Sequence, residues 1–184
     1  GTITGFLGAN GAGKTSTIKC IFELSFPDSG DISYFGKKGL SSEAKTRIGF
    51  LPERPYFYEH LTGREFLRFY GELSTSVTRA VLDGRIEKLL ARVGLTHAGA
   101  RPLRGYSKGM LQRIGIAQAL IHEPDFIILD EPMTGLDPDG RLEVREIIRE
   151  TAAHGTAVFF SSHHLSDAEQ LCEHLVILKQ GELA

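Results

Sequence analysis

Short apolar runs alternate with longer segments of helical period along most of the chain. The runs are rich in β-branched residues and flanked by turn residues, so they predict strands over residues 2–7, 31–35, 47–51, 126–130, 156–160 and 174–178. Apolar residues at helical spacing predict helices over residues 15–24, 62–73, 77–93, 111–121, 142–153 and 166–171. Strands that alternate with helices pair in parallel, so the pattern predicts a layered α/β core.

The stretch from about residue 55 to 121 departs from this alternation, because it holds three helical segments and no convincing strand. We expect one domain over residues 1–184, with a core formed by 1–54 and 122–184 and a helical lobe of about 55–121 inserted in it. Two capping boxes mark expected helix starts, Thr62 with Glu65 and Ser166 with Glu169.

Composition removes several classes of protein. Hydrophobic residues make up 41% and charged residues 24%, which excludes a disordered chain, and the formal net charge of -2 argues against a nucleic-acid-binding surface. No apolar run approaches the ~20 residues of a membrane helix. Cys20 and Cys172 lack the spacing of metal ligands, so we expect reduced thiols in an intracellular protein.

A phosphate-binding loop follows the first predicted strand. Residues 8–15 match G-x-x-x-x-G-K-[ST], in which glycines let backbone N–H groups surround phosphate at the start of a helix. A dinucleotide fingerprint fits poorly, because Lys14 follows Gly13 and the third glycine is absent. The residues expected to bind the nucleotide are Gly8, Asn10, Gly11, Ala12, Gly13, Lys14, Thr15 and Ser16.

Two carboxylates stand where a later apolar strand leaves the core. Asp130 and Glu131 follow a run of four apolar residues that begins at Phe126. A phosphate loop needs such an acidic partner, because Mg²⁺ must be held beside the phosphates. We expect Thr15 and Asp130 to hold Mg²⁺ and Glu131 to polarise the attacking water. The site predicted by these two motifs is one for MgATP or a related triphosphate.

Five segments in this order resemble the nucleotide-binding domain of ATP-binding cassette (ABC) transporters over essentially the whole chain. They are the phosphate loop, Tyr106-Ser107-Lys108-Gly109-Met110-Leu111-Gln112-Arg113, Asp130-Glu131, Gly135-Leu136-Asp137-Pro138 and Ser161-Ser162-His163. Pro52-Glu53, where most of the family has a glutamine, is most similar to the ATPase subunits of ABC-2-type drug and lipid exporters. The resemblance implies a P-loop NTPase fold with a mainly parallel sheet. It also implies that the family's early strands and the aromatic residue that stacks on adenine are missing here.

The resemblance also implies a shared active site. Two such domains, as a homodimer or heterodimer, pair head to tail, and Ser107 and Gly109 of one meet the γ-phosphate held by the other. Taken alone, Ser107 would be an ordinary helix cap. His163 is implied as the catalytic switch histidine, which contacts γ-phosphate and helps position water. The alternatives are a solvated loop histidine and a metal pair with His164, for which no third ligand lies nearby. Glu53 is implied as a further Mg²⁺ ligand, with a surface glutamate as the alternative.

The implied function is an ATPase subunit that powers a separate membrane permease, with ATP and Mg²⁺ as cofactors and no nucleic-acid partner. Its expected place is the cytoplasm, on the inner face of the membrane through that permease. Aromatic residues around 53–79 are candidates for the permease contact. The alternative is a non-transport ABC ATPase of DNA repair or translation. The 93 positions from Lys14 to Ser107 leave no room for the coiled coil of the repair type.

Overall fold

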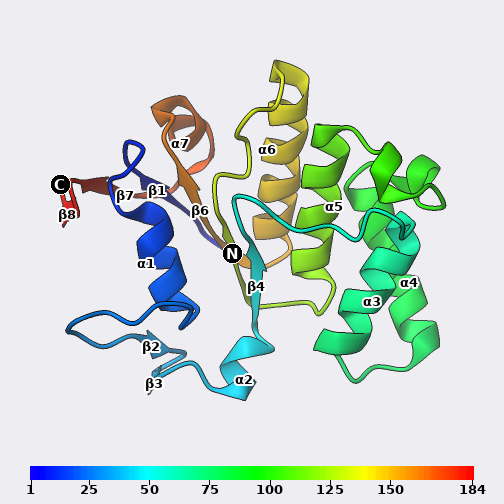
Figure 1. Ribbon diagram of the computed structural model, residues 1–184, viewed down its shortest axis with the longest axis horizontal. Coiled ribbons are helices and arrows are strands. Elements are labelled where there is room, and N and C mark those ends of the chain that lie inside the picture. Colours follow the sequence, from blue (N-terminus) through cyan, green and yellow to red (C-terminus); the bar gives the residue numbers. More distant parts are fainter.

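The computed structural model describes residues 1–184, and its centre is a six-stranded sheet in the order β4-β5-β6-β1-β7-β8 (Figure 1). The first five strands in that order pair in parallel, and β8 adds an antiparallel edge. This confirms the predicted α/β core with a mainly parallel sheet. The strands are β1 (Ile3–Leu7), β4 (Ile48–Leu51), β5 (Phe126–Leu129), β6 (Ala157–Ser162), β7 (His174–Lys179) and β8 (Glu182–Leu183).

Helices surround the sheet. They are α1 (Lys14–Ile21), α2 (Ser42–Lys45), α3 (Gly63–Ser74), α4 (Arg79–Arg92), α5 (Lys108–Leu120), α6 (Pro138–Ala153) and α7 (Leu165–Leu171), with short 3₁₀ turns at Thr96–Ala98 and Leu103–Gly105. In Figure 1, α3, α4 and α5 gather beyond β4, while α1 and α7 lie toward β1 and β7. No helix in residues 1–184 combines the length and apolarity needed to cross a membrane.

The main core joins β5 and its neighbours to the three helices beyond β4. Ile127, Ile128 and Leu129 of β5 are fully buried, which explains why this strand is an unbroken apolar run rather than an alternating one. Helix α5 approaches β4 closely at Gly115, where an added Cβ would lie 2.7 Å from a methyl group of Leu51. The central position of β5 fixes where the following carboxylates leave the core.

Two local predictions need correction. The strand predicted over 31–35 is present only as β2 (Ser33–Tyr34), and it pairs antiparallel with β3 (Lys37–Lys38) in a separate hairpin instead of in parallel as expected for the core strands. Phe35 and Gly36 both have positive φ, the backbone of a tight two-residue hairpin turn, so the short strand is paired locally. Helix α7 begins at Leu165 with no side-chain cap, so the box expected at Ser166 does not form.

Two other helix starts show the capping chemistry clearly. The Thr62–Glu65 box is present as predicted, with the Thr62 N–H donating to Glu65 Oε2 at 2.8 Å. Helix α6 starts at Pro138, four residues before the predicted start, because Asp137 caps it by accepting the Gly140 N–H at 2.9 Å. Side-chain acceptors therefore set both boundaries.

Candidate functional site

The loop between β1 and α1 is shaped by its glycines. Gly11 and Gly13 have φ of 80° and 110°, in the region that side-chain-bearing residues rarely adopt. At Gly8 the constraint is space, since a Cβ there would lie 2.6 Å from the Leu178 carbonyl oxygen of β7. These positions turn the chain tightly into α1, whose N-terminus faces the carboxyl edge of the sheet.

Lys14 is folded over this loop and is only 6% exposed. Its ammonium donates to the carbonyl oxygens of Gly8 at 2.6 Å and Ala9 at 3.3 Å, and it lies 3.3 Å from Glu131 Oε1. The buried charge is thus held by the loop itself and by one carboxylate from β5. Phosphate oxygens placed in the loop would compete with these acceptors for the ammonium.

Asp130 comes directly after β5 and is 2% exposed. Its Oδ2 accepts a hydrogen bond from Thr15 Oγ1 at 3.1 Å, which joins the end of β5 to the first turn of α1. The residues are 115 positions apart in sequence, and the predicted pairing of the phosphate loop with the acidic strand end is therefore present in the geometry.

Glu131 connects the loop to the end of β6. Its Oε2 accepts from Thr134 Oγ1 and contacts His163 Nδ1, both at 2.8 Å, while Oε1 faces Lys14. The backbone of Glu131 has φ 51°, a conformation that non-glycine residues adopt mainly where the surrounding structure demands it. Lys14, Glu131 and His163 thus form one contact group.

A polar pocket of about 370 Å³ surrounds this group. It is lined by Asn10, Gly11, Gly13, Lys14, Thr15, Ser16, Glu53, Glu131, Thr134 and His163. Gly8 and Ala12, which are also expected to bind the nucleotide, do not line the pocket, and Ala12 is 7% exposed. Thr134 is a lining residue that the motifs did not single out, although a hydroxyl three residues after Glu131 is a signal that could have been read.

The pocket offers oxygen donors that fit Mg²⁺. Thr15 and Glu53 line it, and Asp130 lies behind Thr15. No three side chains of Asp, Glu, His or Cys converge as a complete metal cage. Mg²⁺ commonly binds through few protein ligands and completes its shell with water and substrate phosphates, so this sparse donor set suits it.

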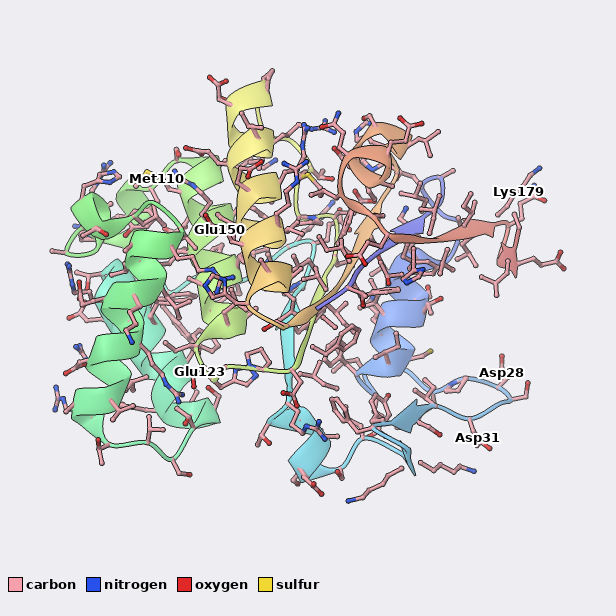
Figure 2. The ribbon with its side chains drawn as sticks, turned by 180° about the vertical axis from the view of Figure 1, so that it is seen from behind. Asp28, Asp31, Met110, Glu123, Glu150 and Lys179 are labelled. Carbon is pink, nitrogen blue, oxygen red and sulfur yellow. The ribbon has the colours of Figure 1, made fainter.

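Ser107 and Gly109 do not line this pocket. Ser107 caps α5, with its Oγ accepting the Met110 N–H at 3.3 Å, and Figure 2 labels Met110 near that helix end. Nothing lies within 4 Å of a Cβ added at Gly109, so this helix start is open. Within one chain, the predicted phosphate contacts of these two residues are not brought together with the loop.

Two residues of this segment, Tyr106 and Lys108, contact neighbouring parts of the chain. The Tyr106 hydroxyl donates to the Ala98 carbonyl at 2.8 Å, and burial raises the pKa of Tyr106. Tyr106 therefore anchors the start of α5 to the neighbouring 3₁₀ turn. The Lys108 side chain runs over Gly135, whose φ is 69°, so this lysine contacts the loop before α6.

A buried carboxylate braces the segment around His163. Asp167 is 1% exposed, accepts from Ser162 Oγ at 3.1 Å and pairs with Arg141 of α6 at 2.7 Å. Ser162 Oγ in turn accepts the His164 N–H at 3.0 Å. The loop carrying His163 is therefore tied to the helix that Asp137 caps.

A larger cavity of about 710 Å³ lies at the opposite, amino end of the strands. It is bordered by α4 and the end of α6, and Figure 2 labels Glu123 and Glu150 on this side. Its arginines are engaged, since Arg85 pairs with Glu123 and Arg92 donates to Thr151. Ligands of open α/β sheets bind at the carboxyl ends of strands, so the smaller polar pocket is the stronger candidate.

Comparisons with known proteins agree on one family. The family model described as "ABC transporter" matches residues 1–134. An ABC transporter ATP-binding protein of Nostoc sp. is 48% identical over 185 residues, which is all of this chain and 55% of that protein. The bacitracin transport ATP-binding protein BcrA of Bacillus licheniformis is 42% identical over 186 residues, again all of this chain and 60% of the relative.

A solved structure gives the same result. The structure of cbiO1 from Clostridium perfringens, described as part of the ABC transporter complex cbiONQ, superposes with a TM-score of 0.87 at 26% identity. The match covers all of this chain and 75% of that one. The chain thus spans 55% to 60% of the two curated relatives and three quarters of the solved one.

Proposed function

Since the chain belongs to the ABC transporter family, we propose that it is the subunit that binds and hydrolyses MgATP to drive a separate membrane permease. The observation that carries this proposal is the contact group of Lys14, Glu131 and His163 in one polar pocket. The pocket lies beside a helix N-terminus at the carboxyl edge of the sheet, where phosphate is favoured. The ABC-2-type variant Pro52-Glu53 favours the exporter branch of the family.

The phosphates of ATP would lie in the loop formed by residues 8–16. Backbone N–H groups and the N-terminus of α1 attract their negative charge. Lys14 is already aimed at this position and would exchange the Glu131 carboxylate for phosphate oxygens. When bound, Mg²⁺ would neutralise charge that develops on the phosphates, with Thr15, Glu53 and Asp130 as its protein partners.

Glu131 is placed to act on water. Its carboxylate is freed when Lys14 turns to phosphate, and one oxygen then accepts a proton from the water that attacks the γ-phosphorus. The bond from that phosphorus to the bridging oxygen breaks, which leaves ADP and inorganic phosphate. His163, 2.8 Å from Glu131, holds the carboxylate and contributes a contact at the γ-phosphate.

The second half of the site would come from another copy or a related subunit. Ser107 and Gly109 sit outside the pocket of their own chain, at an open helix N-terminus that suits an anion. Head-to-tail pairing would place this helix start against the γ-phosphate of the partner. The loop of Gly135 and Asp137 would then lie at the contact between subunits.

Mixing two defective variants tests this pairing. Gly109→Asp adds a negative charge at a position where nothing lies within 4 Å of the new Cβ, so the fold tolerates it. The added carboxylate repels the phosphate that the partner subunit holds. Lys14→Ala removes the cis ligand instead. Each variant alone is expected to be inactive, whereas an equal mixture forms one intact site per mixed dimer and recovers about a quarter of wild-type turnover. Gly109→Ala is the control, and absence of recovery at every mixing ratio would contradict a trans site.

An aromatic patch is the candidate for permease docking. Tyr56 is 78%, Tyr58 37% and Phe69 39% exposed, and the rings contact one another edge to face. Tyr70 contacts both Phe69 and the buried Phe66, which is 1% exposed, and so connects the patch to the core through α3. Exposed aromatic clusters of this kind suit protein contacts. Docking there would hold this subunit at the cytoplasmic face of the membrane.

Glu53→Gln tests the proposed Mg²⁺ ligand. An amide oxygen is a weaker ligand for a hard cation than a carboxylate, so the Mg²⁺ concentration at half-maximal turnover is expected to rise several-fold. Titration of MgCl₂ at saturating ATP measures the shift. Glu59→Gln, an exposed acid of the same loop that does not line the pocket, is the matched control. An unchanged Mg²⁺ titration for Glu53→Gln would make this residue a surface glutamate.

A further inference from the structure

Ser161 lies at the carboxyl end of β6, beside the acidic end of β5. The two strands pair in parallel, with Leu129 opposite Phe160, so the next residues along each strand are neighbours. Ser161 is 0% exposed and therefore contacts neither solvent nor nucleotide directly. Its side chain is nevertheless bonded to both residues of the acidic pair.

The hydroxyl of Ser161 uses its one donor and one of its two acceptor positions in these bonds. It donates its one proton to Asp130 Oδ1 at 2.6 Å and accepts the Glu131 N–H at 2.8 Å. The first distance is typical of a hydroxyl bonded to a charged carboxylate. One buried hydroxyl thus connects the side chain of Asp130 to the backbone of Glu131.

We infer that Ser161 is a positioning residue that orients the side chain of Asp130 and the backbone of Glu131 for MgATP hydrolysis. This inference rests on the proposed function. It acts on Asp130 by occupying one carboxylate oxygen, which leaves the other to receive Thr15 Oγ1 at 3.1 Å. With each oxygen accepting a hydrogen bond from a hydroxyl group, Asp130 would act on Mg²⁺ through Thr15 and water. Ser161 thereby fixes the plane of the carboxylate.

Ser161 acts on Glu131 through the main chain. Glu131 has φ 51°, and its N–H points to the Ser161 hydroxyl. This backbone turn directs the Glu131 side chain away from β5 and toward Lys14, Thr134 and His163. Loss of the hydroxyl would leave a buried N–H without its acceptor and release the turn.

The neighbouring Ser162 has a different role, which makes the assignment specific. Its hydroxyl is also buried, at 3%, but donates to Asp167 and accepts from the His164 N–H. Ser162 therefore supports the His163 loop, whereas Ser161 supports the acidic pair. The alternation of the strand sends the two side chains to opposite faces of the sheet.

The test compares Ser161→Ala with Ser161→Thr, which keeps the hydroxyl. For Ser161→Ala we expect kcat to fall and the Mg²⁺ concentration at half-saturation to rise, each about 10- to 100-fold, as for other residues that orient metal ligands. The KM for ATP should change about threefold or less, because the phosphate loop is intact. Ser161→Thr should restore most of both losses. If threonine does not fold, Ser161→Cys, which has a similar volume but is a weak donor and acceptor, should restore only a small part of them.

Thr151→Ala is the matched control for losing a buried hydroxyl. Thr151 is also 0% exposed and bonded to a charged group, Arg92, but it lies near the end of α6 away from the pocket. Its loss should lower the melting temperature without moving kcat or the Mg²⁺ titration. If Thr151→Ala lowers kcat as much as Ser161→Ala does, the effect is one of stability and the inference fails.

Binding of a fluorescent ATP analogue with and without Mg²⁺ gives a readout that does not depend on turnover. In EDTA, Ser161→Ala should bind the analogue with the same affinity as wild type. With Mg²⁺, the variant should lack most of the gain in affinity that wild type shows. Wild-type kcat and Mg²⁺ dependence in a folded Ser161→Ala protein would overturn the positioning role alone. Failure of the proposed function would instead appear as a wild-type protein that does not hydrolyse ATP, in which case the Mg²⁺ effect on binding still decides the role of Ser161.

Discussion

Lys14→Ala is expected to lower MgATP turnover at least about 100-fold, the scale seen when a preorganised charge is removed from a developing anion. The lysine ammonium is 6% exposed and surrounded by carbonyl oxygens of the loop and by Glu131. No other lysine or arginine lines the pocket, so no neighbouring cation can replace it. Turnover is measured as phosphate release at saturating MgATP, and ATP affinity is measured separately by equilibrium binding.

Lys19→Ala is the control for this substitution. Lys19 lies on the same helix, is exposed and carries the same charge, but it does not reach the pocket. Its loss should leave turnover within about twofold of wild type, as is usual for exposed sites away from special features. Equal rates for wild type, Lys14→Ala and Lys19→Ala would reject hydrolysis in this pocket.

Much of the core could be predicted because its signals are local. The apolar run of β5 has no polar alternation, since both of its faces are covered, and a run of that kind marks a central strand. The hairpin of β2 and β3 shows that local signals do not predict which strands pair. The segment 31–35 has strand composition, but composition does not say which partner it pairs with, and a tight turn at Phe35 and Gly36 lets it pair locally.

A capping-box pattern predicted a helix start only where its side chains reach their targets. Thr62 and Glu65 form the expected reciprocal bonds. The same spacing at Ser166 does not, because α7 already begins at Leu165 and follows the turn that the Ser162 hydroxyl fixes at His164. A tertiary contact therefore decides this boundary, which a four-residue pattern does not contain.

The motifs predicted the charged residues of the pocket and missed the hydroxyls that orient them. The motifs imply roles for Lys14, Glu131 and His163. They give none to Thr134, nor to Ser161 although it stands in the His163 segment, because these two act through their bonds to Glu131 and Asp130. Those bonds depend on the register of β5 against β6, which no pattern in one strand reveals. Supporting residues are therefore harder to find from sequence than the groups that they hold.

The sequence also did not predict the direction of the Lys108 side chain. Its charge suits either the phosphates or solvent, and the structure instead lays the chain over Gly135. Glycine fits here for two reasons, a positive φ of 69° and the space that the lysine occupies. The helix start at Ser107 and the loop before α6 are thus in direct contact.

Glu131→Gln is expected to separate binding from hydrolysis. The amide cannot take a proton from water, so turnover should fall about 100- to 10,000-fold, the contribution expected of a general base. ATP should still bind, and more tightly, because Lys14 loses the buried carboxylate 3.3 Å away that competes with phosphate for its charge. The amide oxygen can still accept from Thr134, so the local structure is retained.

Trapped ATP should also reveal the second subunit. In a head-to-tail dimer the nucleotide lies between the two chains, so ATP that is bound but not hydrolysed favours association by mass action. Size-exclusion chromatography of Glu131→Gln should show a dimer with MgATP and a smaller species with MgADP. Glu72→Gln, an exposed acid on α3 far from the pocket lining, should behave as wild type in both assays. A Glu131→Gln protein that binds MgATP tightly and stays monomeric at every concentration would contradict the trans site while leaving the cis site intact.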